Sequence, residues 1–140
     1  IAPILMEVIT GKRSELQING NDYNTPDGTC IRDYIDVQDL VRAHILAIDY
    51  DKNDIFNLGT EKGASVLDLV KLTEVASGKV IKKLFRERRA GDPPILTASS
   101  QKAKKLLKWQ PLISLPISLD NMLKAYKIPI KNPESNMETY

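Results

Sequence analysis

The sequence has 140 residues, of which 42% are hydrophobic and 27% are charged, proportions typical of a globular domain rather than of a disordered chain. Twenty Lys and Arg residues against 18 Asp and Glu leave a formal charge of +2, which is too small to indicate nucleic acid or an anionic membrane as the partner. One cysteine excludes an internal disulfide and favours a cytoplasmic location. No apolar run approaches the ~20 residues that a membrane span needs.

The first third of the chain is predicted to hold one helix and two short strands. Apolar residues recur at helical spacing over residues 1–9, and Gly11 suits the position just past the helix end. Residues 16–19 and 34–37 are each predicted to be short strands. Between them, residues 20–29 are rich in Gly, Asn, Asp and Pro, which predicts a loop.

The middle third is predicted to contain two helices around one strand. Residues 39–48 show a helical apolar stripe with an acidic residue at the positive end of the helix. Residues 55–58 are a compact apolar run that predicts a strand. Ser65 and Asp68 resemble a capping box, and the helix that they begin is predicted to stop near Gly78.

The last third is predicted to contain one strand and two helices. Residues 80–85 are strand-like, and the Gly and Pro residues of 91–94 force an irregular segment. Helices are expected over 100–108 and 119–126. The chain turns polar at its end, so residues 128–140 are expected to form a loosely held tail.

This alternation of helices and strands predicts an α/β fold of about five helices within a domain over residues 1–127. The predicted strands are too few and too short for a closed sheet, so some are expected to complete a sheet whose other strands lie elsewhere. The chain also begins at Ile1, without Met, inside a predicted helix. We therefore expect a piece of a longer protein.

The sequence lacks the motifs of several common reaction centres. It contains no Gly-rich turn of the kind that cradles a dinucleotide pyrophosphate, so no cofactor-binding residues can be assigned. Cys30 and His44 are its only Cys and His, which excludes a thiolate–imidazole zinc site. Cys30 is expected to be an ordinary loop cysteine, and His44 a core or interface residue. Because no nucleophile–base pair is evident, the sequence indicates binding rather than catalysis.

Three arginines are candidates for binding an anion. Arg32 follows the turn-rich loop, and Arg88 and Arg89 follow a predicted strand just before Asp92. A guanidinium can grip a phosphate with two hydrogen bonds, and a carboxylate can hold two neighbouring sugar hydroxyls. From spacing alone, the alternative remains that these are exposed charges in weak surface salt bridges.

One stretch carries a specific resemblance: residues 20–34 read GNDYNTPDGTCIRDY. This stretch resembles the signature of UDP-galactose/UDP-glucose 4-epimerases, which are extended short-chain dehydrogenases/reductases. Further matching blocks follow in the same order: FNLGT at 56–60, SVL at 65–67, RRAGD at 88–92 and LKW at 107–109. The chain is thus similar to the C-terminal, substrate-binding domain of these enzymes, with the Rossmann domain missing.

The resemblance implies a set of substrate-binding residues. The strand that flanks the uracil ring corresponds to Leu16, Gln17, Ile18 and Asn19. Arg32 and Arg89 match arginines that bind the diphosphate, Asp92 matches the acidic residue at the ribose, and Leu96 borders the hexose pocket. The family usually has an aromatic residue in place of Asn19, so hydrogen bonding to uracil is expected instead of stacking. It usually has His in place of Asp36.

The resemblance also implies a mechanism that this chain cannot complete. In these enzymes an N-terminal Rossmann domain holds NAD, and a tyrosine of a Tyr-x-x-x-Lys motif takes the 4-hydroxyl proton while hydride passes to the nicotinamide. No tyrosine here has a lysine four residues on, so no catalytic residue is assigned and no NAD is expected on this chain. The partners implied are UDP-glucose or UDP-galactose and the missing domain, in a homodimeric parent.

Two other readings remain open. One is a different NAD-linked sugar-nucleotide enzyme, such as a decarboxylase, dehydratase or reductase. The other is a binding or regulatory module without catalysis.

By resemblance, the helix over 40–48 and the strand over 55–58 would pack against the missing domain. We therefore expect them to expose apolar surface when this chain stands alone.

Overall fold

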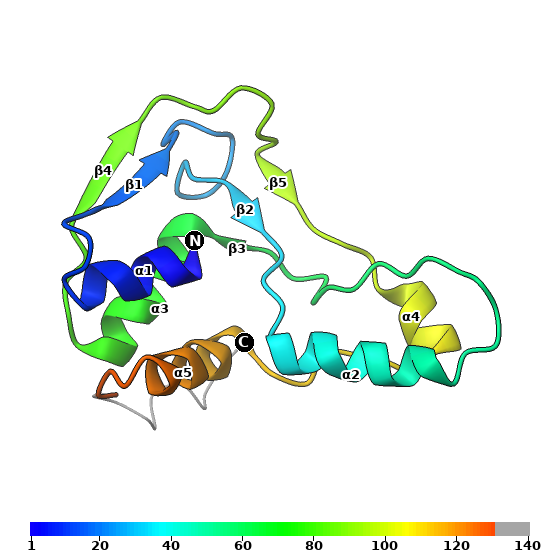
Figure 1. The fold of residues 1–140 in the computed structure, drawn as a ribbon. Coiled ribbons are helices and arrows are strands. Elements are labelled where there is room, and N and C mark those ends of the chain that lie inside the picture. Colours follow the sequence, from blue (N-terminus) through cyan, green and yellow to red (C-terminus); the bar gives the residue numbers. More distant parts are fainter. Residues whose placement is uncertain (131–140) are drawn as a thin grey trace.

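The computed structural model describes residues 1–130, in which five helices and five short strands form (Figure 1). The helices are α1 (Ala2–Ile9), α2 (Val37–Ile48), α3 (Val66–Ser77), α4 (Gln101–Leu106) and α5 (Leu115–Ala125). The strands are β1 (Leu16–Asn19), β2 (Ile31–Arg32), β3 (Ala64–Ser65), β4 (Lys83–Arg86) and β5 (Ile95–Leu96). The expected α/β class and the number of helices are confirmed.

The strands form two small sheets. In the first, β1 and β4 run parallel, with Leu16 opposite Lys83 and Asn19 opposite Arg86. In the second, β2 lies between β3, to which it is antiparallel, and β5, to which it is parallel. The loop from β1 to β2 therefore connects the two sheets.

The larger core lies between α1, α3, α5 and β1. Leu5 and Met6 of α1, Leu69 of α3 and Leu123 of α5 have no exposed surface. Burying a side chain of this size stabilises the fold by roughly 1.5–3 kcal/mol. Leu16 also belongs to this cluster, so its packing against the helices fixes the position of β1.

A second, smaller core joins α2 to α4 and to the segment that follows α4. Its buried members are Ala43, Ala103, Leu107 and Trp109. Figure 1 shows α2 and α4 together on the right, apart from α1, α3 and α5 on the left. The Trp109 indole Nε1 donates a 2.8 Å hydrogen bond to the Asp39 carbonyl oxygen, which connects this segment to the first turn of α2.

Polar caps decide where α2 and α3 begin. The Asp36 side chain accepts a hydrogen bond from the Gln38 backbone N–H and caps α2, which gives the residue in place of the family's usual His a local role. Ser65 and Asp68 form the expected capping box of α3. Gly78 ends α3 in the left-handed conformation, with φ at 63°.

Two of the predicted strands are wrong and one is displaced. The strand expected over 34–37 does not form, because β2 ends at Arg32 and the Asp36 cap already starts a helix at Val37. Residues 55–58 are not a strand either: nothing within residues 1–130 pairs with their backbone. The strand expected over 80–85 forms as β4, slightly later in the chain.

The helical predictions hold within a few residues, with differences in which side chains are buried. Next to α4, Leu107 is buried, whereas Leu106, the last residue of the helix, is 42% exposed. Ile128 was expected to begin the polar tail but is buried against the larger core. The remainder of that expected tail, residues 131–140, lies outside the described residues.

The apolar stripe of α2 is largely uncovered within residues 1–130. Val37, Val41, Ile45 and Ile48 are 51–80% exposed, and Ile55 in the following segment is 82% exposed. The expectation that these segments expose apolar surface is confirmed. No helix of the described residues combines the length and apolar character that crossing a membrane requires.

Candidate binding site

The short pairing of β2 with β5 brings Arg32 and Leu96 together. These two residues are direct partners in the parallel register, one residue after Ile31 and Ile95. Partnered residues of neighbouring strands project to the same face of the sheet. Leu96 is 57% exposed, so its side chain is available to a ligand beside the Arg32 guanidinium.

Arg32, Arg89 and Asp92 form one charged cluster. Arg89 Nη2 and Nε each lie 3.1 Å from Asp92 Oδ2, and Arg32 Nη2 lies 3.7 Å from Asp92 Oδ1. The Asp92 carboxylate thus lies between two guanidinium groups. Three of the residues proposed from sequence therefore meet in space, although they come from separate segments.

The two arginines of this cluster are held differently. Arg32 Nη1 donates to the carbonyl oxygens of Pro93, at 2.9 Å, and of Ile31, at 2.8 Å, and the side chain is 24% exposed. The Arg89 side chain is 70% exposed, and within residues 1–130 its polar partner is Asp92. Because exposed ion pairs contribute little, a phosphate could replace the Asp92 contact of Arg89 at small cost.

Strand β1 offers alternate side chains to solvent. Gln17 and Asn19 are exposed, whereas Leu16 and Ile18 are 1% and 2% exposed and belong to the core. Only the backbone of Leu16 and Ile18 is therefore left for a ligand. The four residues assigned together from sequence divide into two that face outward and two that hold the strand in place.

An open hollow lies where the parallel strands β1 and β4 end. It measures about 540 Å³ and is lined by Asn21 and Asp22 after β1, by Phe85 and Arg86 at the end of β4, and by Glu87 and Arg88 after it. Ligands of α/β proteins commonly bind beyond the carboxyl ends of parallel strands. The hollow therefore lies at the edge where a ligand of such a fold would be expected.

Arg88, considered with Arg89 from sequence, has another role in the structure. Its Nε donates a 2.7 Å hydrogen bond to Asp22 Oδ1, its Nη2 donates to the Asp22 carbonyl oxygen, and the guanidinium stacks 4.4 Å from the centre of the Tyr23 ring. The hydrogen bond from Arg88 lowers the pKa of Asp22. Arg88 therefore clamps the loop after β1, whereas Arg89 points to Asp92.

Tyr23 and Cys30 lie buried beneath this clamp. Tyr23 is 5% exposed, and its hydroxyl has no hydrogen-bond partner among the described residues. Burial, together with the neighbouring Cys30 thiol, raises the pKa of Tyr23. Gly20 has φ at +80°, and a Cβ there would lie 2.4 Å from Tyr23 Cε2, so glycine is required at this turn. The loop is built for packing, and Cys30 is the plain loop cysteine that was expected.

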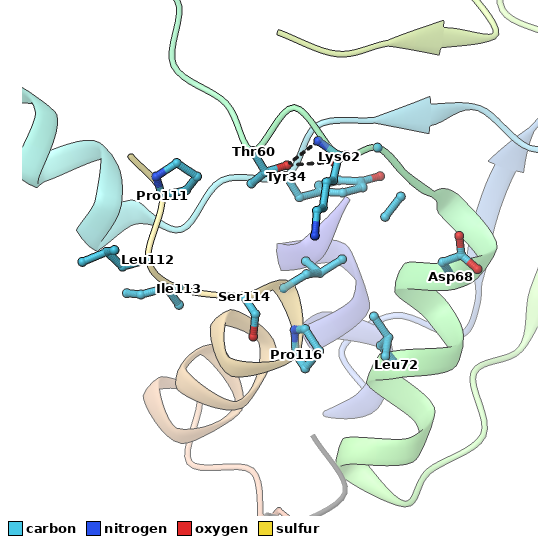
Figure 2. A pocket seen from close by; sticks show the side chains of 13 residues that line it. Tyr34, Thr60, Lys62, Asp68, Leu72, Pro111, Leu112, Ile113, Ser114 and Pro116 are labelled. Carbon is cyan, nitrogen blue, oxygen red and sulfur yellow. Dashed lines mark hydrogen bonds between the residues drawn. The ribbon is translucent and has the colours of Figure 1, made fainter. Parts of the chain in front are cut away.

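A second cavity of about 370 Å³ was not indicated by the sequence (Figure 2). It lies between Tyr34, the turn from Thr60 to Lys62, and the segment that leads into α5. Burial raises the pKa of Tyr34. None of the residues proposed from sequence lines this cavity. Its walls are mostly apolar, and no sequence motif marked it because its residues come from four separate segments.

The site can bind and orient, but no reaction centre is visible among residues 1–130. No group of three metal-ligating side chains occurs in this part of the chain. His44, expected in a core or interface, is exposed, and its Nδ1 lies 2.8 Å from the Leu40 carbonyl oxygen. The Asp92 cluster offers two guanidinium groups, which can bind an anion, and one carboxylate, which can accept from hydroxyl groups.

Comparisons with known proteins identify the family of the chain. The family model described as GDP-mannose 4,6 dehydratase matches residues 1–122. The UDP-glucose 4-epimerase of Lacticaseibacillus casei is 45% identical over 115 residues, which are 79% of this chain and 35% of that protein. UDP-glucose 4-epimerase 1 of Oryza sativa subsp. japonica is 46% identical over 117 residues, covering 79% and 33%.

Solved structures resemble the whole described fold. The UDP-glucose 4-epimerase from Brucella ovis in complex with NAD has a TM-score of 0.86 at 36% identity and covers 93% of this chain and 42% of that one. The enzyme from Bifidobacterium longum in complex with NAD+ and UDP has a TM-score of 0.80 at 37% identity, covering 89% and 39%. The chain spans about a third of the length of the curated relatives it matches.

Proposed function

Because the chain belongs to the family described as GDP-mannose 4,6 dehydratase, and its relatives are UDP-glucose 4-epimerases, we propose that it is the UDP-sugar-binding part of such an epimerase. The complete enzyme would interconvert UDP-galactose and UDP-glucose through a 4-keto intermediate. This chain, which spans about a third of its relatives, would supply substrate recognition. Residues 1–127 would be that domain.

The arrangement of Arg32, Arg89 and Asp92 carries the proposal. Two guanidinium groups on either side of one carboxylate suit a ligand with phosphates next to sugar hydroxyls. We assign Arg32 and Arg89 to the diphosphate and Asp92 to the ribose. When the ligand binds, the arginines would turn from Asp92 toward the phosphates and leave its carboxylate free for hydroxyl groups.

The two ends of the ligand would lie on the two sheets. Gln17 and Asn19 would present polar side chains to uracil at the edge of β1, while Leu16 and Ile18 contribute only backbone. Leu96, partnered with Arg32, would border the hexose. The uracil end would then be read by hydrogen bonds and the hexose end by shape.

NAD is implied by the related structures, and we assign none of its binding residues to this chain, whose sequence has no Gly-rich pyrophosphate turn. The helix N-caps are Ile1, Asp36, Ser65, Ser100 and Ser114. Gly59 and Gly63 precede α3, yet a Cβ on either would clash with the chain itself, at Asp33 and Ile31 respectively. Neither glycine therefore opens a cradle toward a pyrophosphate. NAD, which would accept and return the hydride, is assigned to another part of the complete enzyme.

The partner of this chain would be that cofactor-binding part. The exposed stripe of α2 and the extended residues 55–58 offer an apolar surface for it. The catalytic tyrosine and lysine would come from the same part, in a cytoplasmic and dimeric enzyme.

A different NAD-linked sugar-nucleotide enzyme is the second candidate, favoured by the dehydratase description of the family model. A binding module without catalysis is the third.

Two measurements test the proposal. The complete protein, given UDP-galactose, should produce UDP-glucose, whereas a dehydrated or decarboxylated product would favour the second candidate. The 140-residue chain alone, with UDP-galactose and NAD, should produce neither, because its sequence lacks the Tyr-x-x-x-Lys pair. Conversion by a pure sample of the chain would contradict the division of labour proposed here.

A further inference from the structure

Asp33 is the most heavily hydrogen-bonded carboxylate near the proposed site. Its Oδ1 accepts from the Thr60 N–H at 2.8 Å and from Thr60 Oγ1 at 2.5 Å. Its Oδ2 accepts from the N–H groups of Glu61 at 3.1 Å and Ala98 at 3.2 Å. Both oxygens are thus occupied by donors from within the chain, so Asp33 is not free to contact a ligand.

The donors come from two segments that flank the Arg32–Leu96 pair. Thr60 and Glu61 belong to the turn before β3, and Ala98 lies two residues beyond Leu96. Gly59 allows the close approach, because a Cβ there would lie 2.5 Å from Asp33 Oδ2. The carboxylate therefore joins β2, the turn and the end of β5 at one point.

The β2–β5 pairing is too short to fix Arg32 by itself. It comprises Ile31 with Ile95 and Arg32 with Leu96, supported by a hydrogen bond from the Ile31 N–H to the Pro94 carbonyl oxygen. Arg32 also donates to the Pro93 carbonyl oxygen, before β5. The Asp33–Ala98 bond is the link on the other side of β5. Arg32 is therefore held in register from both ends.

We propose that Asp33 is a positioning residue, which sets the Arg32 guanidinium and the Leu96 side chain against the diphosphate and sugar of the substrate. The inference rests on the proposed function, because it assigns Arg32 to the diphosphate. It predicts that Asp33 acts on ligand affinity through Arg32. An unspecific effect on folding would not depend on whether Arg32 is present.

A double-mutant cycle separates these two effects. Calorimetry measures the affinity for UDP of four proteins: the protein without substitutions, Asp33→Asn, Arg32→Ala and the double variant. An Asn at 33 keeps one acceptor but turns an amide N–H₂ toward donors, so the link to Ala98 or to Thr60 is lost. We expect Asp33→Asn to weaken UDP binding roughly tenfold, the size of one lost hydrogen bond to a charged group. In the Arg32→Ala background it should change affinity less than twofold.

Two further variants distinguish a positioning role from a general loss of folding. Thr60→Val removes the Oγ1 bond to Asp33, together with the Oγ1 contacts to the Lys62 backbone, and keeps the three backbone N–H bonds to Asp33. It should weaken UDP binding less than Asp33→Asn does, in the same direction. Asp39→Asn is the matched control: Asp39, in the first turn of α2, is another carboxylate that accepts from backbone N–H groups, but these belong to Leu112 and Ile113, at 2.9 Å, and not to the segments around β5. It should lower the melting temperature and leave UDP affinity within twofold.

The outcomes are distinguishable. If Arg32→Ala leaves UDP affinity unchanged, the proposed function fails and the positioning role fails with it. If Arg32→Ala weakens binding but Asp33→Asn has the same effect with and without Arg32, the proposed function stands and the positioning role is overturned. An equal loss of affinity in Asp39→Asn would also overturn it, because any buried carboxylate would then serve as well.

Discussion

Arg89 is the most accessible charged side chain of the proposed site, and its substitution gives the cleanest test of phosphate binding. Arg89→Ala should weaken UDP binding by roughly 1.5–3 kcal/mol, the range for a hydrogen bond to a charged group. Arg89→Lys should restore only part of this loss, because lysine lacks the planar fork that grips two oxygens. Calorimetric titration with UDP measures both effects.

The matched control for Arg89 is Arg13. It is also an exposed, ion-paired arginine, 3.0 Å from Glu7 at the end of α1 and outside the proposed site. Arg13→Ala should leave UDP affinity unchanged. Unchanged affinity in Arg89→Ala as well would make Arg89 an ordinary surface charge.

Leu96 should influence which sugar is accepted. Its side chain is apolar, intermediate in size and 57% exposed beside Arg32. An apolar wall discriminates by roughly 1–3 kcal/mol per misfit group. We predict that the complete enzyme prefers UDP-glucose and UDP-galactose but turns over N-acetyl sugars measurably. Leu96→Ala should raise the ratio of kcat/KM for the N-acetyl sugar to that for the plain hexose, and Leu96→Tyr should lower it.

Ile95 provides the control for this series. It is 54% exposed, and as the neighbour of Leu96 in β5 its side chain projects to the other face of the strand. Ile95→Ala should leave the ratio of kcat/KM values unchanged. A ratio that moves in the opposite order in the Leu96 variants would show that Leu96 does not line the hexose pocket.

At the scale of elements, Asp27 connects the loop between β1 and β2 to the start of α3. Its Oδ1 accepts from the Thr29 N–H at 2.9 Å and from Thr29 Oγ1 at 2.7 Å, and its Oδ2 accepts from Ser65 Oγ. Desolvation by burial raises the pKa of Asp27, but the hydrogen bonds from Ser65 and Thr29 outweigh it, so the net shift is downward.

This lowered pKa makes a pH-dependent prediction. A carboxyl whose pKa is lower in the folded state stabilises the protein above its unfolded pKa, about 3.9 for Asp, and loses that contribution as the pH falls through the folded value. Asp27→Asn should therefore lower the free energy of unfolding by about 1 kcal/mol at neutral pH. The difference should shrink in acid. Urea unfolding at several pH values tests this, with the exposed Asp51→Asn as the control.

The elements that the sequence predicted well are those whose signals are local. The capping box at Ser65, the left-handed Gly78 and the apolar stripe of α5 each lie within a few residues, so pattern alone located these helices. Strand β5, two residues long, was not foreseen, because its only support is pairing with β2, more than sixty residues earlier. Residues 55–58 failed for the opposite reason: the apolar run is present, but no neighbouring strand lies beside it in residues 1–130.

The same distinction holds for the candidate site. Arg32, Arg89 and Asp92 were identified from motifs, and the structure brings them together. The separate roles of Arg88 and Arg89 could not be read from sequence, because they depend on Asp22 and Tyr23 across the loop. Asp33 was likewise hidden, since its donors lie 27 and 65 residues away.

At the scale of the whole molecule, the two groups of helices differ in how completely they are covered. The group of α1, α3 and α5 encloses a closed core (Figure 1). The group of α2 and α4 buries one side of α2 and leaves the other as an apolar stripe. Because large exposed apolar patches are rare on stable monomers, we propose that this stripe is an interface. In the proposed enzyme, the cofactor-binding part would cover it.

The 140-residue chain alone should therefore associate with itself through α2. Ile45 and Ile48 are 58% and 80% exposed, so replacing both with lysine removes little from the core of the chain while it adds charge to the stripe. We predict that Ile45→Lys with Ile48→Lys reduces the concentration-dependent association seen by sedimentation and leaves the melting temperature nearly unchanged. Val80→Lys is the matched control: Val80 is 91% exposed but lies after α3, outside the stripe, and its substitution should leave association as it was. In the complete enzyme, the same double substitution should instead lower thermal stability, because there the lysines would have to be buried against the covering part. Equal stability of the substituted and unsubstituted complete enzyme would mean that α2 faces solvent there too.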